Sequence, residues 1–325
     1  MKKYLLFFLL IVQAMIAQGQ EQVSMTITSG LNDYIVKSRI ESRSGALLTE
    51  IKQAANANRN LTLTTIGMTD PARESLSRLW NTYHFRPNSS AYSTYCISTV
   101  SGYEVRGIGA TVCDVDDSFI GEKNKEMVIN YSKEGDITGV HMALGNHVYH
   151  QVVESGKDVT DVRRREEILR FVEEFRSYYD EKDIDALRDI YSDDALIITG
   201  TVKMRKKMGD DQVRMQPEIV YSLKNKEQYL TSLSRTFRNN RYIKVRFDNI
   251  KVVRHPAKAG FYGVTLHQNW QSSTYEDDGY VFLLWEFKDD DTPPVIHVRT
   301  WQPDMVGDVA LPESEVFNHN DFFIE

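Results

Sequence analysis

Twice along the chain, apolar residues at helical spacing are followed by apolar residues that alternate with polar ones. The helical stretches lie at 25–58, 70–80, 161–178, 184–191 and 226–237, and the strand-like stretches at 92–145, 195–199 and 242–301. Helices followed by runs of antiparallel strands predict an α+β fold. Because 325 residues exceed the usual size of one domain, we expect this arrangement in two domains.

The domain boundary is predicted at the polar segment Ser155-Gly156-Lys157-Asp158. An N-terminal α+β domain is therefore expected over 20–158, a second domain over 159–303 and a C-terminal tail over 304–325. Turn residues at Ser101-Gly102 and at 133–136 predict two hairpins in the first domain. Residues 202–221, which include the basic run 203–208, show no clear period and are expected to form a long loop.

The first nineteen residues have the organisation of a secretory signal peptide. A short basic segment, Met1-Lys2-Lys3, precedes an apolar run over 4–17 that only Gln13 interrupts. Ala17-Gln18-Gly19 then places small residues at the positions a signal peptidase requires. We expect cleavage before Gln20 and a periplasmic or secreted protein with no membrane span after cleavage. The alternative is an uncleaved anchor, although the run is short for a transmembrane helix.

Charge and composition exclude several classes of protein. A net charge of −7 argues against a nucleic-acid partner, which would require a basic surface. Two cysteines, Cys96 and Cys113, are too few for a cysteine-built zinc or iron–sulfur site. An oxidising compartment would allow them to form a disulfide, although pairing about Ser101-Gly102 places Cys96 opposite Gly107. The acidic runs fit turns rather than calcium loops, so we expect neither a metal nor a cofactor.

The segment Asp183–Leu196, DIDALRDIYSDDAL, resembles the signature of the nuclear transport factor 2-like superfamily, in particular its SnoaL-like branch. That signature is a short second helix ending in an aromatic residue, here Tyr191, and an Asp-Asp-Ala corner that enters the first strand. The resemblance covers residues 160–303, almost half of the chain. The whole chain also resembles uncharacterised exported bacterial proteins of two domains, which brings no activity with it.

The resemblance implies a cone-shaped domain in which a curved sheet wraps around helices and encloses a pocket at its wide end. Members of the superfamily include isomerases, dehydratases and polyketide cyclases as well as non-catalytic binding modules, so the fold does not select the function. Asp193 and Asp194 are expected to accept backbone N–H bonds at the corner, and the alternative role for Asp194 is that of an acid or base. The first domain is either a divergent copy of the second or, as we favour, an unrelated α+β domain.

Aromatic and basic residues of the last strands are the candidate ligand-binding groups. The candidates are Tyr191, Trp270, Trp285, His297, Arg299 and Trp301. Strict alternation places His297, Arg299 and Trp301 on one face of the final strand. Such a cluster would suit an aromatic-walled site for an anionic or ring-bearing ligand. The alternative is an outer sheet surface on which tryptophans pack against the first domain or a second subunit.

No pair of titratable residues has a spacing that predicts catalysis. We therefore expect a non-catalytic binding or assembly module whose partner is an unknown small molecule or an envelope protein. One alternative is a SnoaL-like enzyme, such as an isomerase, dehydratase or hydrolase, that works in the cone pocket. The other is a structural envelope protein that forms a homodimer through its sheet face.

Overall fold

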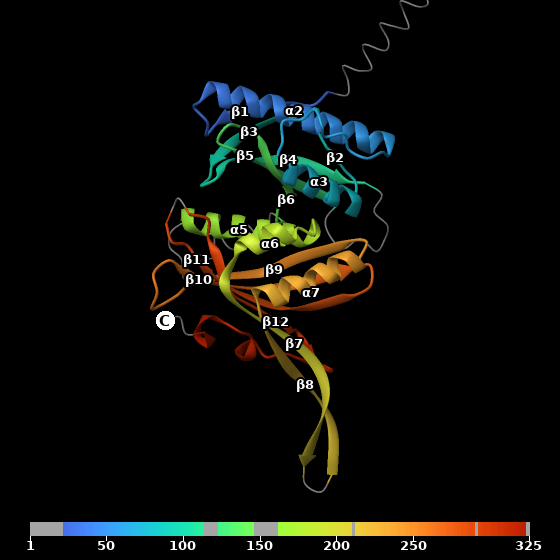
Figure 1. Ribbon diagram of the computed structural model, residues 1–325, viewed down its shortest axis with the longest axis vertical. Helices are drawn as coiled ribbons and strands as arrows, with labels where there is room; N and C mark the ends of the chain where they lie inside the picture. The colour runs from blue at the N-terminus through green and yellow to red at the C-terminus, as the bar shows by residue number, and fades with distance from the viewer. Residues whose placement is uncertain (1–21, 114–122, 146–161, 210–211, 290–291, 323–325) are drawn as a thin grey trace, which may run out of the picture. The chain divides into compact units, whose positions relative to one another are not determined.

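The chain divides into two units between Ala143 and Leu144. The structure, a computed structural model, describes residues 22–113, 123–145, 162–209, 212–289 and 292–322 (Figure 1). The predicted signal peptide and the boundary predicted at 155–158 both lie outside these ranges. Within these ranges, no helix is both long enough and apolar enough to cross a bilayer. Both units combine helices with mainly antiparallel sheets, which confirms the α+β fold class.

Where the structure describes it, the first unit has two helices and one mixed sheet. Its elements are β1 (Ser24–Ser29), α2 (Tyr34–Ala57), α3 (Asp70–Thr82), β2 (Phe85–Pro87), β3 (Ala91–Ser98), β4 (Gly102–Val112), β5 (Asn124–Ser132) and β6 (Ile137–Met142). The sheet has the order β1-β3-β4-β5-β6, and β2 pairs with β4. Both predicted hairpins are present, as the β3–β4 and β5–β6 pairs.

The helix predicted from residue 25 is wrong in its first turns. Residues 24–29 form β1, which pairs in parallel with β3, and the helix α2 begins only after Asp33. Met25 and Ile27 are buried while their neighbours are exposed, which is the period of a strand. The Asp33 carboxylate accepts hydrogen bonds from the backbone of Ile35 (2.9 Å) and Val36 (3.1 Å) and so fixes the start of the helix.

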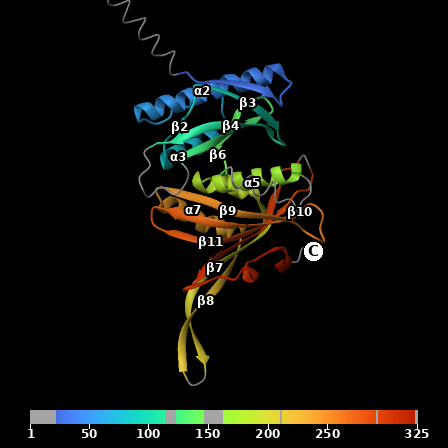
Figure 2. The ribbon, with the colours of Figure 1, turned by 180° about the vertical axis from the view of Figure 1, so that it is seen from behind.

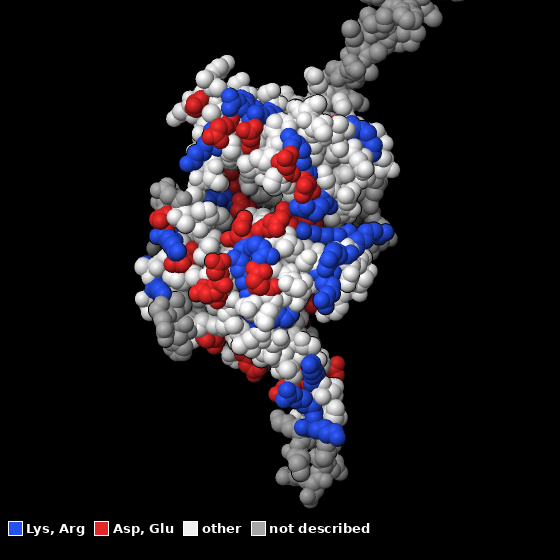
Figure 3. All heavy atoms as spheres, viewed as in Figure 1, with Lys and Arg blue, Asp and Glu red and all other residues white. Residues whose placement is uncertain are grey.

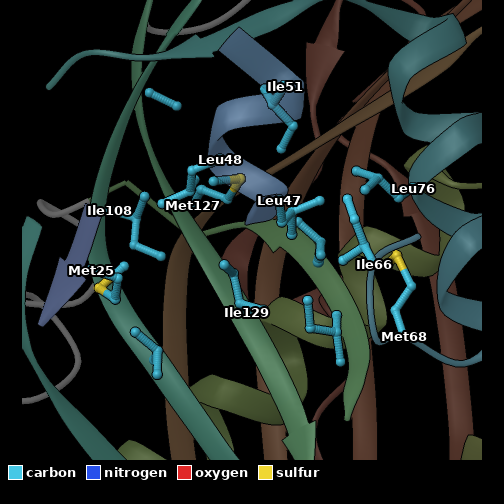
Figure 4. Packing of buried hydrophobic residues seen from close by; sticks show 14 of the residues in the cluster. Met25, Leu47, Leu48, Ile51, Ile66, Met68, Leu76, Ile108, Met127 and Ile129 are labelled. Atoms are coloured by element: carbon cyan, nitrogen blue, oxygen red, sulfur yellow. The ribbon is translucent and has the colours of Figure 1, made fainter. Parts of the chain in front are cut away.

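One apolar core joins α2 and α3 to the sheet of the first unit. Figure 4 shows Leu47, Leu48 and Ile51 of α2 facing Met127 and Ile129 of β5. These five side chains are fully buried. The apolar stripe of the helix therefore packs on one face of the sheet, as expected for a two-layer domain.

In its described residues the second unit has three α-helices, a six-stranded sheet and a C-terminal tail with two short 3-10 helices. Its elements are α5 (Val162–Asp180), α6 (Ile184–Ile190), β7 (Tyr191–Gly209), β8 (Gln212–Asn225), α7 (Lys226–Asn239), β9 (Ile243–Arg254), β10 (Phe261–Ser272), β11 (Glu276–Glu286), β12 (Val295–Pro303), β13 (Met305–Val306) and β14 (Val309–Ala310). The strand order is β8-β7-β12-β11-β10-β9. All the pairs are antiparallel except that of β12 with β7.

The six-stranded sheet has two differently covered faces. The inner face is the one that packs on α5, α6 and α7 in a single core, with Phe175, Leu230 and Trp285 among the buried residues. The outer face carries a smaller cluster that includes Phe261, Phe282, Leu284 and Val298. Figure 2 shows the sheet and its helices from behind. A sheet that packs on three helices is part of the arrangement that the sequence resemblance implies.

The long loop predicted over 202–221 is in fact a two-stranded ribbon. β7 and β8 pair without interruption from Leu196 and Asn225 to Gly209 and Gln212. β12 pairs with β7 only as far as Thr199, so the remainder of the ribbon extends beyond the sheet (Figure 1). We call residues 201–209 and 212–220 the arm. The prediction failed because no third strand packs beside the arm. Its side chains therefore face no core that would require regularly spaced apolar residues.

The tail after Pro303 folds back on the outer face of the sheet. Phe322 stacks on Phe282 with 5.5 Å between the ring centroids, and Phe317 belongs to the same cluster. The buried Gln302 side chain donates to the Glu315 carbonyl (2.9 Å) and accepts from the Phe317 amide (2.8 Å). The tail is therefore part of the fold of the second unit.

The structure does not join Cys96 and Cys113 by the disulfide that the sequence allows. Cys96 pairs with Val105 across β3 and β4, whereas Cys113 follows the last residue of β4. Eight residues of extended strand separate Val105 from Cys113, a span of roughly 25 Å. The two sulfur atoms are thus far beyond bonding distance.

The two thiols should differ in reactivity. Burial raises the pKa of Cys96 to about 11, which leaves almost no thiolate at neutral pH. We expect iodoacetamide to label Cys113, which is half-buried, in the native protein and to label both residues after unfolding without reductant. Peptide mass spectrometry measures both outcomes. A disulfide-linked peptide after unfolding would contradict this prediction.

Candidate functional site

Five of the six candidate residues lie on the inner face of the second unit. Tyr191, Trp285 and Arg299 are buried there, and Trp270 and Trp301 are half-buried against the same core. Val264, Leu266, Val281 and Leu283 of β10 and β11 face the same core, as alternation along these strands requires. The interpretation as an outer sheet surface therefore does not apply to these five residues.

His297 lies on the other face of the sheet. Strict alternation placed it beside Arg299, but a β-bulge interrupts β12 between Ile296 and Val298. The His297 ring contacts the outer-face residue Phe261 (5.4 Å between centroids), and its Nε2 is 2.8 Å from Glu286 Oε2. His297 is thus separated from the inner-face group by the sheet itself.

A buried guanidinium and three tyrosine hydroxyls form the centre of the inner-face group. The Tyr179 hydroxyl is 2.8 Å from that of Tyr229 and 3.2 Å from that of Tyr191. Arg299 lies over the Tyr229 ring, with Cζ 5.2 Å from the centroid. Each tyrosine comes from a different element: Tyr179 from α5, Tyr191 from the start of β7, directly after α6, and Tyr229 from α7. The packing of the helices on the sheet therefore assembles the group.

The ionisation of these groups follows from their burial. Burial raises the pKa of Tyr191 and Tyr229 well above the ordinary value, so both hydroxyls remain protonated. For Arg299, burial lowers the pKa, but the neighbouring hydroxyls of Tyr229, Tyr179 and Tyr191 outweigh it and the net shift is upward. The centre of the group is therefore a permanent cation among neutral hydroxyls.

Asp277 is a further member of this group that the sequence analysis missed. It lies on β11, on the same face as Val281 and Leu283, and pairs with Trp270 of β10. Burial raises the pKa of its carboxyl to about 6, although the Tyr275 hydroxyl and Arg299 act in the opposite direction. A carboxyl that titrates near neutrality beside a buried cation is typical of functional sites.

The signal for Asp277 was present but was interpreted as a turn. Glu276-Asp277-Asp278-Gly279 has the composition of a hairpin turn, yet these residues open strand β11. The turn lies just before them, where Ser272 and Tyr275 exchange hydrogen bonds. Gly279 serves packing instead, because a Cβ there would lie 2.9 Å from Cε2 of Trp301.

Several polar atoms of the group lack partners. Among the described residues, the buried atoms Arg299 Nε, Trp301 Nε1, Trp285 Nε1 and Asp277 Oδ1 have no hydrogen-bond partner. Nor does any described carboxylate form an ion pair with Arg299. Unpaired buried donors cost free energy, typically about 1–3 kcal/mol each, and call for water or a ligand. The half-buried Trp270, Trp301 and Asp277 mark the side from which this group reaches solvent.

Three aspartates of the signature segment have structural partners. Asp183 caps α6 by accepting from the Ala186 amide (3.0 Å). Asp193 accepts from Lys226 Nζ (2.9 Å) rather than from the backbone predicted for it. Asp194 bonds the Ser192 hydroxyl and lies 3.6 Å from His297 Nδ1 on the outer face. Asp194 therefore does not join Arg299 and the tyrosines.

Metal-ligating residues do not gather in the part of the chain that the structure describes. There, no three His, Cys, Asp or Glu residues form a group that could hold an ion. The acidic run at 114–117 lies outside the described residues. The inner-face group itself, with a cation at its centre and one carboxylate, is suited to an anion rather than to a metal.

Replacement of Asp277 by Asn should stabilise the protein at high pH. Because the folded-state pKa is raised from 3.8 to about 6, the folded protein holds an extra proton between these values. The free energy of unfolding therefore falls as the pH rises through this window. Asp277→Asn should raise the free energy of unfolding by up to about 3 kcal/mol at about pH 8 and change it little at about pH 4. Chemical denaturation at both pH values measures the difference.

Glu276→Gln, which removes an exposed carboxylate one residue away, controls for the change in net charge. If the free energy of unfolding varied with pH in the same way for Asp277→Asn and the unmodified protein, burial would not raise the pKa of this carboxyl.

Comparisons with known proteins show likeness of structure without likeness of sequence. No protein-family model matches the chain. The curated proteins contain no match either.

Solved structures of several kinds resemble this chain. Bd1075 of Bdellovibrio bacteriovorus is 14% identical, with a TM-score of 0.33 over 60% of this chain and 70% of that one. An NTF2-like protein of unknown function from Pseudomonas putida KT2440 is 11% identical, with a TM-score of 0.33 over 47% and 96%. A naphthalene 1,2-dioxygenase is 8% identical, with a TM-score of 0.35 over 49% and 88%. These scores are low, so the α+β assignment rests on the strand order and the helix packing described above.

Proposed function

We propose that the second unit is a non-catalytic binding module for a small anionic molecule that carries a ring. The observation that carries this proposal is the buried Arg299, which has an unpartnered Nε and no ion-paired carboxylate among the described residues. As a compartment we propose the periplasm or the cell exterior, on the strength of the first nineteen residues alone.

A buried unpaired cation is costly, and this cost argues for a ligand. Removing a charge from water costs several kcal/mol unless a partner compensates. The Tyr229 ring and the tyrosine hydroxyls compensate in part, since a cation over an aromatic face gains about 0.5–2 kcal/mol. A carboxylate or phosphate ligand would accept from Arg299 Nε and complete the pairing.

The tryptophans next to Arg299 support a ring-bearing ligand. Trp301 is two residues along β12 from Arg299, and Trp270 lies on β10, opposite Asp277. Both indoles are half-buried, so each presents part of its surface to a molecule that reaches Arg299 from the solvent side. Indole rings provide a large apolar surface at low entropic cost, and the free Trp301 N–H adds a donor.

The outer face offers less support for the structural alternative. Phe317 and Phe322 of the tail pack on Phe282 and Leu284, where a sheet-face homodimer would need an open surface. The tail thus occupies part of the surface that two copies would have to share. A homodimer through the remainder of this face is a weaker proposal than ligand binding.

A proton-transfer enzyme is the second candidate, and Asp277 is the observation in its favour. A carboxyl with a pKa of about 6 can accept and return a proton at neutral pH. Such an enzyme would exchange the α-protons of a keto acid such as phenylpyruvate with deuterated water faster than buffer does, and Asp277→Asn would abolish the effect. A binding module would leave the exchange at the buffer rate.

Arg299→Met should separate binding from stability. We expect benzoate and indole-3-acetate to raise the melting temperature of the unmodified protein, while the uncharged benzamide and indole do not. In Arg299→Met the shift should disappear while the melting temperature without ligand stays equal or rises, because an apolar side chain replaces a buried charge. Differential scanning fluorimetry measures both quantities.

Arg238→Met, which alters an exposed arginine of α7, is the matched control and should keep the shift. Equal shifts by the charged and uncharged compounds would exclude an anion site at Arg299.

A further inference from the structure

The arm has one apolar and one polar face. In β7, the side chains of Val202 and Met204 point to the same side as those of their partners Ile219 and Pro217 in β8. Lys206 and its partner Met215 continue this side toward the tip. The opposite side carries the polar residues Thr201, Lys203, Arg205, Gln216 and Glu218, with Val220 at the end nearest the sheet. We call Val202, Met204, Met215, Pro217 and Ile219 the apolar strip.

Much of the apolar strip is uncovered. The exposed fractions are 57% for Met204, 52% for Met215 and 36% for Val202. Nearer the sheet the cover improves, because the Tyr221 ring lies 5.3 Å from that of Phe317 and Pro217 lies beside Gly307. The strip therefore becomes more open with distance from the core. A two-stranded ribbon is marginal in water, and this one extends roughly 30 Å past its last contact with β12.

Cations surround the apolar strip. Lys203 and Arg205 lie on the opposite face, and Lys206 lies within the strip side itself; all three are exposed. Figure 3 shows basic side chains, in blue, gathered on the arm. Among the described residues of the arm, one acid offsets them, since Glu218 Oε2 is 3.7 Å from Arg205 Nε. The arm is thus basic in a chain whose net charge is −7.

The position of Lys206 argues against a second copy of the chain as the cover. Two strips packed face to face would bury Lys206 of each copy among methionines. No described residue on the strip side of the arm is an acid that could pair with it. An unpaired buried ammonium costs several kcal/mol. A partner with an apolar interior and a negatively charged surface avoids this cost, because its surface can pair with the Lys206 ammonium.

We infer that the arm docks on an anionic lipid surface, with the apolar strip inserted at the boundary between headgroups and acyl chains. In that orientation Met204, Met215 and Val202 enter the apolar layer. Lys206 extends its stem along them to reach a phosphate, as long cationic side chains do at interfaces. Lys203 and Arg205, one strand thickness above, lie at the level of the headgroups, where each cation attracts anionic lipid. The arm lies on the membrane and does not span it.

Vesicle co-sedimentation of the mature chain tests this inference. We expect binding to vesicles of equal parts phosphatidylcholine and phosphatidylglycerol, little binding to pure phosphatidylcholine, and weakening as salt rises. Lys203→Gln/Arg205→Gln/Lys206→Gln should weaken binding tenfold or more, since each cation near an anionic surface contributes about a factor of five. Met204→Ser/Met215→Ser should reduce binding even at low salt, because it removes the inserted groups.

Two variants elsewhere provide matched controls. Arg235→Gln/Arg238→Gln removes exposed cations of α7, and Val309→Ser removes an exposed apolar residue of β14. Both should bind as the unmodified protein does. Equal binding of the arm variants and the unmodified protein would overturn the inference, as would equal binding to both kinds of vesicle. So would a dimer in light scattering that Met204→Ser/Met215→Ser converts to a monomer, since the strip would then face a second copy.

Discussion

The unbroken alternation along β7 and β8 determines which side of the arm is apolar and which face of the sheet each side continues. Inside the sheet, one side of β7 contributes Ile197 to the helix-covered core, and the other contributes Leu196 to the outer face. Past Thr199 the same alternation continues without a third strand. The apolar side of the arm is therefore the continuation of the outer face, and its polar side continues the inner face. A shift by one residue would reverse both.

Much of the fold of the second unit could be predicted from the sequence because its elements are strongly periodic. The helices around Phe175 and Leu230 and the strands around Leu266 and Leu283 lie where the apolar spacing placed them. The arm could not be predicted in this way. Its apolar side chains pack on no core, so nothing selects the regular spacing from which a strand is recognised.

The kinds of residue in the candidate site could be predicted from the sequence, but not which particular residues belong to it. Burial of Arg299 and the tryptophans on one face follows from alternation, which is a local property. The bulge at His297 and the four-residue displacement of the turn before Asp277 are not local, since both depend on pairing with a neighbouring strand. Sequence reasoning therefore included a histidine from the wrong face and left out the carboxyl from the right one.

The hydrogen bonds of Gln302 have a consequence for how the second unit unfolds. This buried amide is satisfied by the tail, through Glu315 and Phe317, and by the Tyr221 hydroxyl at the root of the arm (2.8 Å). Detachment of the tail would leave its carbonyl and an N–H without partners in an apolar surrounding. The free energy needed to open the tail locally is thus close to that needed to open β12 itself. We therefore expect the amide hydrogens of β12 and of the tail as far as Phe322 to exchange as one cooperative unit.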